Sequence, residues 1–593
     1  MVKIFFPDSS IHTQKGLSPN SRLFFNTAQS WRNIWLFFSI MLMHSCSTTK
    51  QIPVPTGTIG NTDMVVTAYP AASHVGSKIL QEGGNAIDAA VAVQFALAVT
   101  YPRAGNLGGG GFAVVRMNDG ETRTLDFREK ASRHAHRDMY LDHQKNVIPG
   151  LSLQGPLASG VPGTVHGMYQ LHSWKGRLSW EEVIQPAIDL AENGFKVTAQ
   201  QAAVFNRYKD DFFSVNGHDI PLMKEGGWKE GDVLLLPDLA ATLRRIQKDG
   251  SDGFYQGKTA QLIVREMEAG GGLIDYEDLA RYQSKWRLPL KATYKNYNIL
   301  TMPPPSSGGV ALIQMLKGLE DKKLHRYEHN SGEYTHLLVE VEKRAYADRA
   351  TFLGDPDYAP VPTDEIISDT YIKERMGGID LATVTPSSEI KEGYVEIIES
   401  VETTHFSIVD KERNAVAITT TINSNFGSKL WIDGAGFLMN NEMDDFSSKP
   451  GVPNQFGLLG NEINSIEPEK RMLSSMTPTI VEQNGNLFMV LGSPGGSTII
   501  TTVLQTILNV TEFNMSMQEA VNAKRFHHQW MPDEIQHETG AFEPHIMSQL
   551  KLRNYTFRDR GKIGMCDAIM VHKDGTLEGA PDLTRGDNTA VGR

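Results

Sequence analysis

Apolar runs separated by glycines and charged residues divide the chain into short strands and helices. Met64–Ala68 is a short run that predicts a strand, and Pro70–Leu80 predicts a helix. Ala86–Thr100 (AIDAAVAVQFALAVT) is apolar almost all round, and a helix of that kind must be buried. The glycine-rich stretch Gly105–Gly111 leads into a further predicted strand, Phe112–Met117.

The C-terminal third alternates in the same way, with more regular strands. His405–Asp410 and Ala415–Thr421 are two predicted strands whose four-residue connection indicates a hairpin. Leu487–Leu491 is another strand, and the turn Gly492–Ser497 (GSPGGS) separates it from an apolar helix, Thr498–Val510. Hairpin-linked strands mixed with helices predict an α/β (α+β) protein with layered packing and an antiparallel core.

The N-terminus reads as an export signal. Ile34–Met43 is an uninterrupted apolar run of ten residues after Arg32, which is too short to span a bilayer and suits the core of a signal peptide. The following Cys46 lies in a stretch that resembles the cleavage box of bacterial lipoproteins, where the cysteine is lipidated. The alternative is an ordinary secretory signal with an unrelated cysteine. Residues 1–46 are therefore interpreted as the signal peptide and 47–61 as a polar tether, which predicts a periplasmic or membrane-anchored bacterial protein.

Composition narrows the class of partner. The 593 residues carry a formal net charge of −12, and no stripe of Lys and Arg with interleaved aromatic residues is visible, so nucleic acid is not an expected partner. Hydrophobic residues make up 40% and charged residues 21%, as in folded globular proteins. Only two cysteines are present, Cys46 and Cys566, and their different contexts predict no disulfide framework.

Thr403-Thr404-His405 stands directly before a predicted strand. Because β-branched residues favour strands, these threonines by themselves have a structural explanation. The functional interpretation requires Thr403 to become a chain terminus. A threonine hydroxyl is a weak nucleophile at neutral pH, and an adjacent α-amine, which titrates at about 7.7–8.0, can serve as its base.

Glycines and histidines suggest other sites. Gly495 and Gly496 lie where a strand ends and a helix begins, a place where free N–H groups face an anion. No lysine follows them, so they do not form a phosphate loop, and Gly105–Gly111 precedes a strand instead of opening a helix, which excludes a dinucleotide loop. Four histidines share no helix face and form no H-E-x-x-H motif, so neither a metal nor a cofactor is expected: His134, His136, His527 and His528.

A series of motifs runs from about Met64 to Arg593. The first half contains GGNAIDAAVA (Gly83–Ala92), GGGGF (Gly108–Phe112), DFRE (Asp126–Glu129), ASGVPGTVHG (Ala158–Gly167), PPPSSGG (Pro303–Gly309) and AYADRATFLGDP (Ala345–Pro356). The second half contains TTHFSIVD (Thr403–Asp410), NNEMDDF (Asn440–Phe446), PGVPN (Pro450–Asn454), LSSMTPT (Leu473–Thr479) and GSPGGS (Gly492–Ser497). With these motifs the chain resembles the γ-glutamyltransferase family of N-terminal nucleophile hydrolases.

The resemblance implies a fold and a processing event. The fold is a four-layer αββα sandwich with mostly antiparallel central sheets. Autocatalytic cleavage between Glu402 and Thr403 divides the domain into a large subunit, 62–402, and a small catalytic subunit, 403–593. Thr403 becomes the nucleophile, the Thr421 hydroxyl hydrogen-bonds it, and the N–H groups of the two glycines form the oxyanion hole.

The resemblance also implies how a γ-glutamyl donor, such as glutathione, is held. Glu442 stands where some relatives carry Gln, and recognition is expected to survive this change. A lid-like segment, Pro450–Asn461, favours small donors, although Phe456 stands where some relatives have Tyr. The substrate's α-carboxylate is assigned to Arg128, Ser474 and Ser475, and its α-amine to Asn423, Glu442 and Asp445.

The predicted function is therefore a self-cleaving γ-glutamyltransferase and glutathione hydrolase. It passes a γ-glutamyl ester on Thr403 to water or to an amino acid or peptide amine. One alternative is a related acylase or poly-γ-glutamate-processing enzyme, against which Arg128, Asp445 and the lid-like segment argue. The other is a catalytically silent surface lipoprotein, against which the intact catalytic set argues.

Overall fold

The computed structural model describes residues 56–390, 403–449, 452, 454–455, 460 and 462–593. The expected signal peptide with Cys46, residues 47–55 of the expected tether, Glu402 and most of the lid-like segment with Phe456 lie outside the described residues. The rest of the expected tether is not all loop, because Thr58–Gly60 pairs with Leu577–Gly579 as a strand. The described residues belong to one compact unit. No described helix is both long and apolar enough to cross a membrane.

Two seven-stranded sheets form the centre of this unit, and all strand pairs within them are antiparallel. The first sheet has the order β21 (Thr589–Gly592), β2 (Met64–Thr67), β10 (Thr404–Val409), β11 (Ala415–Thr421), β3 (Gly110–Arg116), β4 (Thr122–Asp126) and β7 (Lys285–Arg287). The second has the order β1 (Thr58–Gly60), β20 (Leu577–Ala580), β19 (Asp567–Val571), β15 (Asn486–Gly492), β14 (Thr479–Gln483), β9 (Tyr297–Thr301) and β8 (Leu290–Tyr294).

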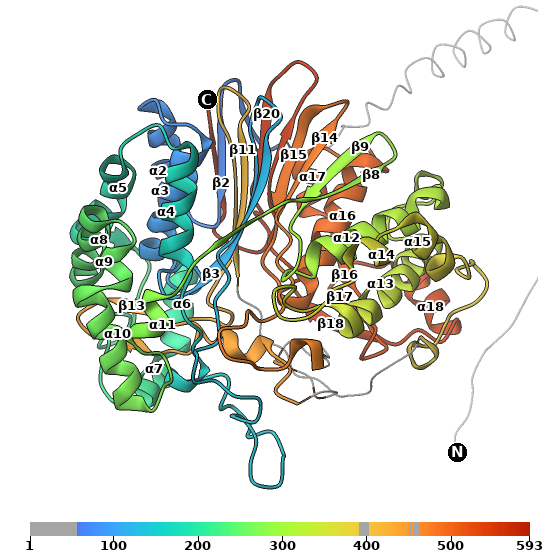
Figure 1. Cartoon of the computed structure of the whole chain (residues 1–593). Coiled ribbons are helices and arrows are strands. Elements are labelled where there is room, and N and C mark those ends of the chain that lie inside the picture. The colour runs from blue at the N-terminus through green and yellow to red at the C-terminus, as the bar shows by residue number, and fades with distance from the viewer. Residues whose placement is uncertain (1–55, 391–402, 450–451, 453, 456–459, 461) are drawn as a thin grey trace, which may run out of the picture. The chain divides into compact units, whose positions relative to one another are not determined.

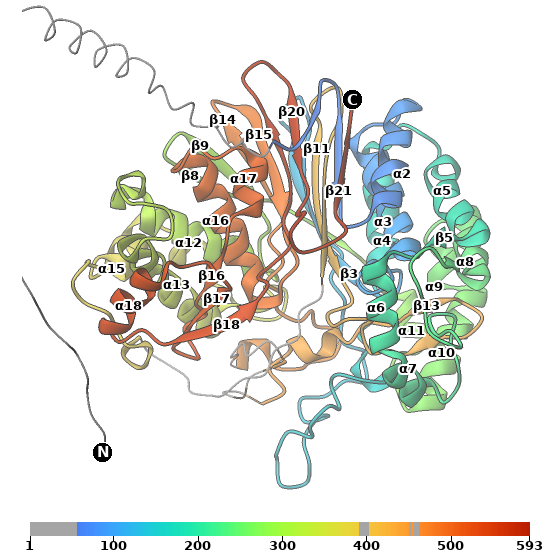
Figure 2. The ribbon, with the colours of Figure 1, turned by 180° about the vertical axis from the view of Figure 1, so that it is seen from behind.

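Helices cover the outer face of each sheet, which gives four layers (Figures 1 and 2). On the side of the first sheet, α2 (Pro70–Gln81), α3 (Ala86–Thr100) and α4 (Thr164–Lys175) contact its strands, and α5 (Trp180–Asn193), α8 (Pro237–Asp249) and α10 (Gly257–Gly270) lie farther out in the same helical layer. On the side of the second sheet, α12 (Gly308–Leu319), α16 (Ile499–Thr511) and α17 (Met517–Asn522) contact its strands, and α13 (Gly332–Phe352) packs on α12. The expected αββα sandwich with antiparallel sheets is confirmed.

Alternation along the strands separates the layers of the core. Met64 and Val66 point between the two sheets and pack with Ile480 and Val490 of the opposite sheet. Val65, between them in sequence, points outward to the helices. Because side chains alternate across a strand, one short apolar strand serves two cores, which is why these strands are apolar on both faces.

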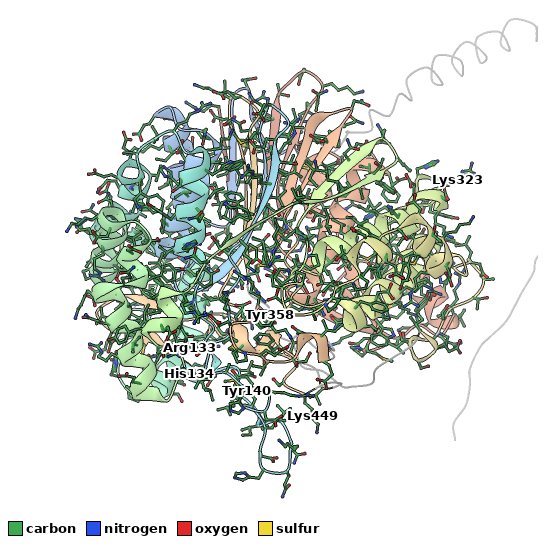
Figure 3. The ribbon with its side chains drawn as sticks, viewed as in Figure 1. Arg133, His134, Tyr140, Lys323, Tyr358 and Lys449 are labelled. Carbon is green, nitrogen blue, oxygen red and sulfur yellow. The ribbon has the colours of Figure 1, made fainter. Side chains whose placement is uncertain are left out.

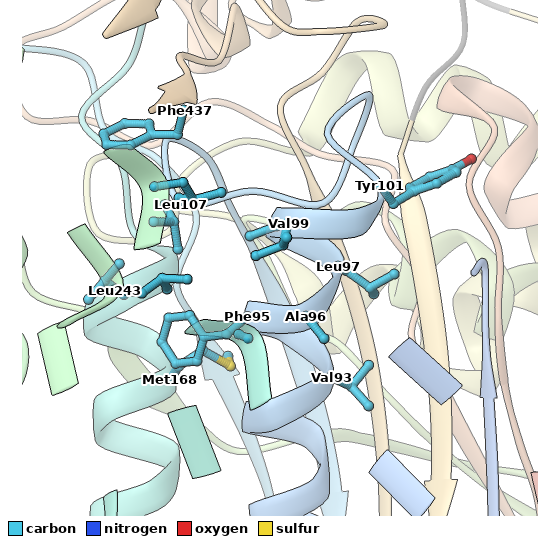
Figure 4. Packing of buried hydrophobic residues seen from close by; sticks show 14 of the residues in the cluster. Val93, Phe95, Ala96, Leu97, Val99, Tyr101, Leu107, Met168, Leu243 and Phe437 are labelled. Carbon is cyan, nitrogen blue, oxygen red and sulfur yellow. The ribbon is translucent and has the colours of Figure 1, made fainter. Parts of the chain in front are cut away.

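The predicted buried helix is confirmed as α3, all of whose residues are buried. Asn85 caps it: its side chain accepts the N–H groups of Ile87 and Asp88, and the Asp88 side chain accepts the N–H of Asn85. Figure 4 shows its apolar side chains among those of neighbouring elements. The helix α3 packs on the strands next to the predicted nucleophile, since it contacts both β10, which follows Thr403, and β11, which ends at Thr421.

The predicted hairpin is confirmed as β10 and β11, with Thr404 opposite Thr420. Its neighbour β3 begins at Gly110, two residues before the predicted start, because Gly110 and Gly111 pair with Thr421 and Thr420. A side chain at Gly110 would lie 2.5 Å from the Phe127 carbonyl oxygen, so only glycine permits this approach. The register brings the start of β10 and the end of β11 together at the same end of the hairpin.

Candidate active site

Thr403 lies just before β10 and is buried, with 5% of its surface exposed. Its Oγ1 donates a hydrogen bond to Thr421 Oγ1 at 3.4 Å. Thr421 Oγ1 also accepts the N–H of Asn423 at 2.7 Å. Asn423 has a left-handed backbone (φ 73°), which asparagine tolerates, and so turns the chain sharply after β11. The predicted nucleophile and its partner are therefore adjacent, fixed by the hairpin register.

Gly495 and Gly496 connect β15 to the short 3₁₀ turn Gly496–Thr498 and then to α16. Their φ angles are 146° and 53°, and a Cβ at Gly495 would lie 2.6 Å from Thr498 Oγ1. The Gly495 carbonyl accepts the N–H and the hydroxyl of Thr498 at 3.0 and 2.8 Å. Because C=O and N–H of one peptide unit point in opposite directions, this turns the Gly496 N–H away from the helix, and Gly496 lines the same cavity as Thr403.

Arg128 follows β4 and is fully buried. Its guanidinium donates to Glu442 Oε1 and, at 2.5 Å, to Asp445 Oδ2. Glu129 Oε2 lies 3.6 Å from Nη1, and the carbonyl oxygens of Met472 and Leu473 each accept at 3.3 Å. The cation predicted to hold a carboxylate and two of the groups predicted to hold an amine thus pair directly with each other.

Three carboxyl groups share this single guanidinium, so the cluster is rich in acid. Burial raises the pKa of Glu129 to about 7, although the charge of Arg128 opposes the rise. Burial likewise holds the pKa of Glu442 well above its usual range and raises that of Asp445. Burial disfavours the charge of Arg128, but the carboxylates outweigh it and raise its pKa. An additional positive charge, such as an ammonium group, is therefore favoured in this cluster.

Ser474 and Ser475 are held by the PPPSSGG segment and by α13. The Ser474 carbonyl accepts the N–H and the hydroxyl of Ser307 at 2.7 and 2.6 Å, while the Ser474 N–H donates to the Pro305 carbonyl at 3.0 Å. Arg349 donates from Nε to Ser307 Oγ at 2.9 Å and from Nη2 to Ser475 Oγ at 3.3 Å. Arg349 and Ser307 were not assigned to the site from the sequence, although Ser307 lies in the motif Pro303–Gly309 and Arg349 in the motif Ala345–Pro356.

One small cavity unites the predicted residues. The space that the centre of a water molecule can reach is about 20 Å³, which is room for about one water. An amino-acid-sized ligand therefore needs more space than this cavity offers. The lining contains every residue predicted for catalysis or substrate binding except Gly495, with three additions: Arg128, Arg349, Thr403, Thr421, Asn423, Glu442, Asp445, Ser474, Ser475, Met476, Gly496 and Ile499.

The described part of the lid-like segment reaches the acidic cluster. Asn454 Nδ2 donates to Asp445 Oδ1 at 3.2 Å, and the Gln455 N–H donates to Asp444 Oδ2 at 3.0 Å. Ser152 donates to the other Asp444 oxygen at 2.7 Å, and burial raises the pKa of Asp444 to about 6. The segment is thus tied to the residue that precedes Asp445.

Three of the four histidines considered as metal ligands, His134, His527 and His528, make ordinary hydrogen bonds. His134 lies at the surface beside Arg133 (Figure 3), and both contact Asp275, at 3.0 and 2.5 Å. His527 Nδ1 lies 2.9 Å from Thr501 Oγ1, and His528 Nε2 lies 3.1 Å from an Asp533 oxygen. Within the described ranges, no three His, Cys, Asp or Glu side chains form a group that could hold a metal ion.

Comparison with known proteins gives matches along nearly the whole chain. The model of the family described as Gamma-glutamyltranspeptidase matches residues 72–592. The glutathione hydrolase proenzyme of Escherichia coli (strain K12) is 45% identical over 531 residues, which cover 89% of this chain and 91% of that protein. The crystal structure of cephalosporin acylase from Bacillus halodurans has a TM-score of 0.78 at 25% identity and covers 92% of this chain and 99% of that one. The crystal structure of Helicobacter pylori gamma-glutamyltranspeptidase is 45% identical with a TM-score of 0.55 and covers 57% of this chain and 97% of that one.

Proposed function

Because the chain belongs to the gamma-glutamyltranspeptidase family, we propose that it is a γ-glutamyltransferase and glutathione hydrolase whose precursor cleaves itself before Thr403. The observation that carries this proposal is the single cavity in which Thr403, Thr421 and Gly496 meet a buried arginine and an acidic cluster. The first three residue types suit acyl transfer, and the charged set suits a zwitterionic amino acid.

The first step produces the nucleophile. The Thr403 hydroxyl attacks the carbonyl of the preceding residue, and the peptide C–N bond breaks as an ester to Thr403 Oγ1 forms. Water then hydrolyses this ester and leaves Thr403 with a free α-amine. That amine is the base that a threonine nucleophile needs.

The second step transfers the γ-glutamyl group. Thr403 Oγ1 attacks the γ-carbonyl of the donor while its α-amine takes the hydroxyl proton, and the N–H groups of Gly495 and Gly496 stabilise the oxyanion. As the tetrahedral intermediate collapses, the C–N bond breaks and the leaving amine takes up that proton. Water yields glutamate from the resulting ester, and an amino acid or peptide amine yields a new γ-glutamyl amide.

Donor recognition is an exchange of ion pairs. In the free site Arg128 is paired with Glu442 and Asp445. The donor's α-carboxylate takes the place of these acids on Arg128, and its α-ammonium takes the place of Arg128 on the acids. A zwitterion brings both charges at once, so no buried charge is left unpaired. Leaving one unpaired would cost roughly 3–5 kcal/mol.

An acylase for other amide side chains is the alternative, since a cephalosporin acylase shares the fold. A glutaryl amide, which lacks the α-amine, distinguishes the two. It would bring a carboxylate to the acidic cluster without the ammonium that balances it. We expect the enzyme to hydrolyse γ-glutamyl amides far faster than glutaryl amides, and the reverse preference would favour the acylase.

We also propose that the protein is exported, with residues 1–46 as signal peptide and a lipid on Cys46. The apolar run before Cys46 supports this. Mass analysis of the mature N-terminus, with Cys46→Ser as control, tests it. A mature chain that begins elsewhere and carries no lipid would refute the anchor while leaving the enzyme untouched.

The decisive experiment is self-cleavage. Residues 47–593 are purified, incubated at neutral pH and weighed intact beside Thr403→Ala. From the chain mass of 65.7 kDa, fragments of about 39 and about 21 kDa are expected by length, with Thr403 at the new terminus, and only the cleaved protein should release glutamate from glutathione. Thr404→Ala is the matched control, because the Thr404 hydroxyl has no hydrogen-bond partner among the described residues. A wild type that stays whole and inactive would refute the proposal.

A further inference from the structure

Arg349, on α13, is a second buried cation at the cavity. Only 4% of its surface is exposed, and among the described residues no carboxylate oxygen lies within ion-pair distance of its guanidinium. Its guanidinium donates instead to two hydroxyls, Ser307 Oγ and Ser475 Oγ. Burial lowers the pKa of Arg349 to about 10, and the charge of Asp445 opposes this shift, so the side chain stays charged at neutral pH. A buried charge without a counter-ion is costly and marks a place where an anion is favoured.

The direction of these hydrogen bonds is fixed, because arginine has donors and no acceptor. Ser475 Oγ must therefore accept from Arg349, which leaves the Ser475 hydroxyl hydrogen to be donated elsewhere. Ser307 accepts from Arg349 Nε in the same way and passes its own hydrogen to the Ser474 carbonyl at 2.6 Å. Arg349 thus fixes both serines, one directly and one through Ser307.

We infer that Arg349 is a positioning and specificity-determining residue: it fixes the Ser475 hydroxyl as a donor to the α-carboxylate of the γ-glutamyl substrate and supplies the unpaired positive charge that this carboxylate balances. The inference rests on the proposed function and deepens it. The two arginines then have different roles. Arg128 exchanges its acidic partners for the substrate, whereas Arg349 has no acidic partner to give up and organises the serine side in advance.

Two donors that differ by one group test this role. γ-Glutamyl-p-nitroanilide carries the α-carboxylate, and 4-aminobutyryl-p-nitroanilide lacks it while keeping the amine. The measured quantity is the ratio of kcat/KM for the first donor to kcat/KM for the second. In Arg349→Gln we expect this ratio to fall roughly ten- to a hundredfold, the loss expected for a hydrogen bond to a charged group, mainly through a higher KM for the γ-glutamyl donor. A merely structural role would slow both donors alike, and an unchanged ratio would overturn the inference.

Further variants separate positioning from folding. Arg349→Lys keeps the charge but cannot contact both serines, so it should recover part of the ratio. Arg375→Gln is the control, because Arg375 pairs with Asp348, the residue before Arg349, at 2.9 Å and does not line the cavity. It should leave the ratio unchanged.

If Arg349→Gln fails to fold or to cleave itself, Ser307→Ala carries the test, because it removes one of the two anchors and leaves the arginine in place. The ratio of kcat/KM values should fall in Ser307→Ala as well. In the double variant Ser307→Ala/Ser475→Ala, the fold decrease in this ratio should be smaller than the product of the fold decreases in the two single variants. An unchanged ratio in Ser307→Ala, with a double variant no different from Ser475→Ala alone, would overturn the inference. A wild type inactive on both donors would instead refute the proposed function, so the two failures are distinguishable.

Discussion

Replacing Arg128 by methionine tests the electrostatics of the cavity. Arg128 is the shared counter-ion of Glu129, Glu442 and Asp445. Methionine reaches only as far as arginine Nε and carries no charge, so the variant leaves three buried carboxyl groups without their shared counter-ion. The change is best made with Thr403→Ala, so that the unfolding of one uncut chain is measured in every case.

The loss of unfolding free energy in the Arg128→Met variant depends on pH, and the direction of this dependence follows from the raised pKa values of the three acids. Burial already raises the pKa of Glu129 to about 7, and removing Arg128 raises the folded-state pKa values of all three acids further. A carboxyl group whose folded pKa is raised stabilises the fold below its unfolded pKa, and this contribution is lost as pH rises through the folded pKa. We expect the loss of unfolding free energy relative to the parent to be about 3–5 kcal/mol at pH 8.

At pH 5 the carboxyl groups of the variant carry less negative charge than at pH 8, so the remaining loss comes mainly from hydrogen bonds that Arg128 gave to two backbone carbonyls. This loss should be about 1–2 kcal/mol. Urea unfolding of parent and variant at pH 5 and pH 8 measures both values. Adding Glu442→Gln to the variant removes one buried charge and should restore part of the stability at pH 8 alone. Equal losses at the two pH values would refute this account of the cluster.

Three further changes have expected outcomes of their own. Thr421→Val keeps the shape but removes the hydroxyl beside Thr403; self-cleavage and kcat should fall about tenfold or more, and wild-type rates in single-turnover assays would exclude a role for that hydroxyl. Gly495→Ala places a methyl group 2.6 Å from Thr498 Oγ1 at a φ of 146°; kcat should fall about 10²–10³-fold with little change in KM, whereas a change in KM alone would contradict the oxyanion assignment. Trp530→Phe removes a buried N–H that donates to two carbonyls at 2.9 Å; urea unfolding should show a loss of about 1–3 kcal/mol with unchanged kcat per cleaved molecule.

Sequence periodicity predicted the local elements well. The all-round apolar pattern of Ala86–Thr100 gave a buried helix with those same bounds, and the predicted hairpin lies in the middle of a sheet. These successes have a local cause. A helix or a hairpin is decided by residues a few positions apart, and their pattern is visible in the sequence.

The members of the candidate site were predicted through the family resemblance, but their pairing was not. Arg128 and Glu442 are 314 positions apart, and no periodicity relates them. They meet because the first sheet places β10 and β11, from the C-terminal part, between β2 and β3, from the N-terminal part. Arg349 was not predicted as a site residue for the same reason, since a lone arginine within a helix is more often a solvent-exposed cation.

The sequence by itself thus determined the strands, the helices, the type of fold and the chemical groups that a γ-glutamyl enzyme needs. The tertiary structure alone decided which of these groups form ion pairs or hydrogen bonds with one another. It showed that Arg128 is occupied by its own acids, that Arg349 has hydroxyl partners in place of acidic ones, and that the free cavity holds about one water. The physical reason is that burial and charge pairing depend on distances between segments far apart in the chain, and only the packed sheets fix those distances.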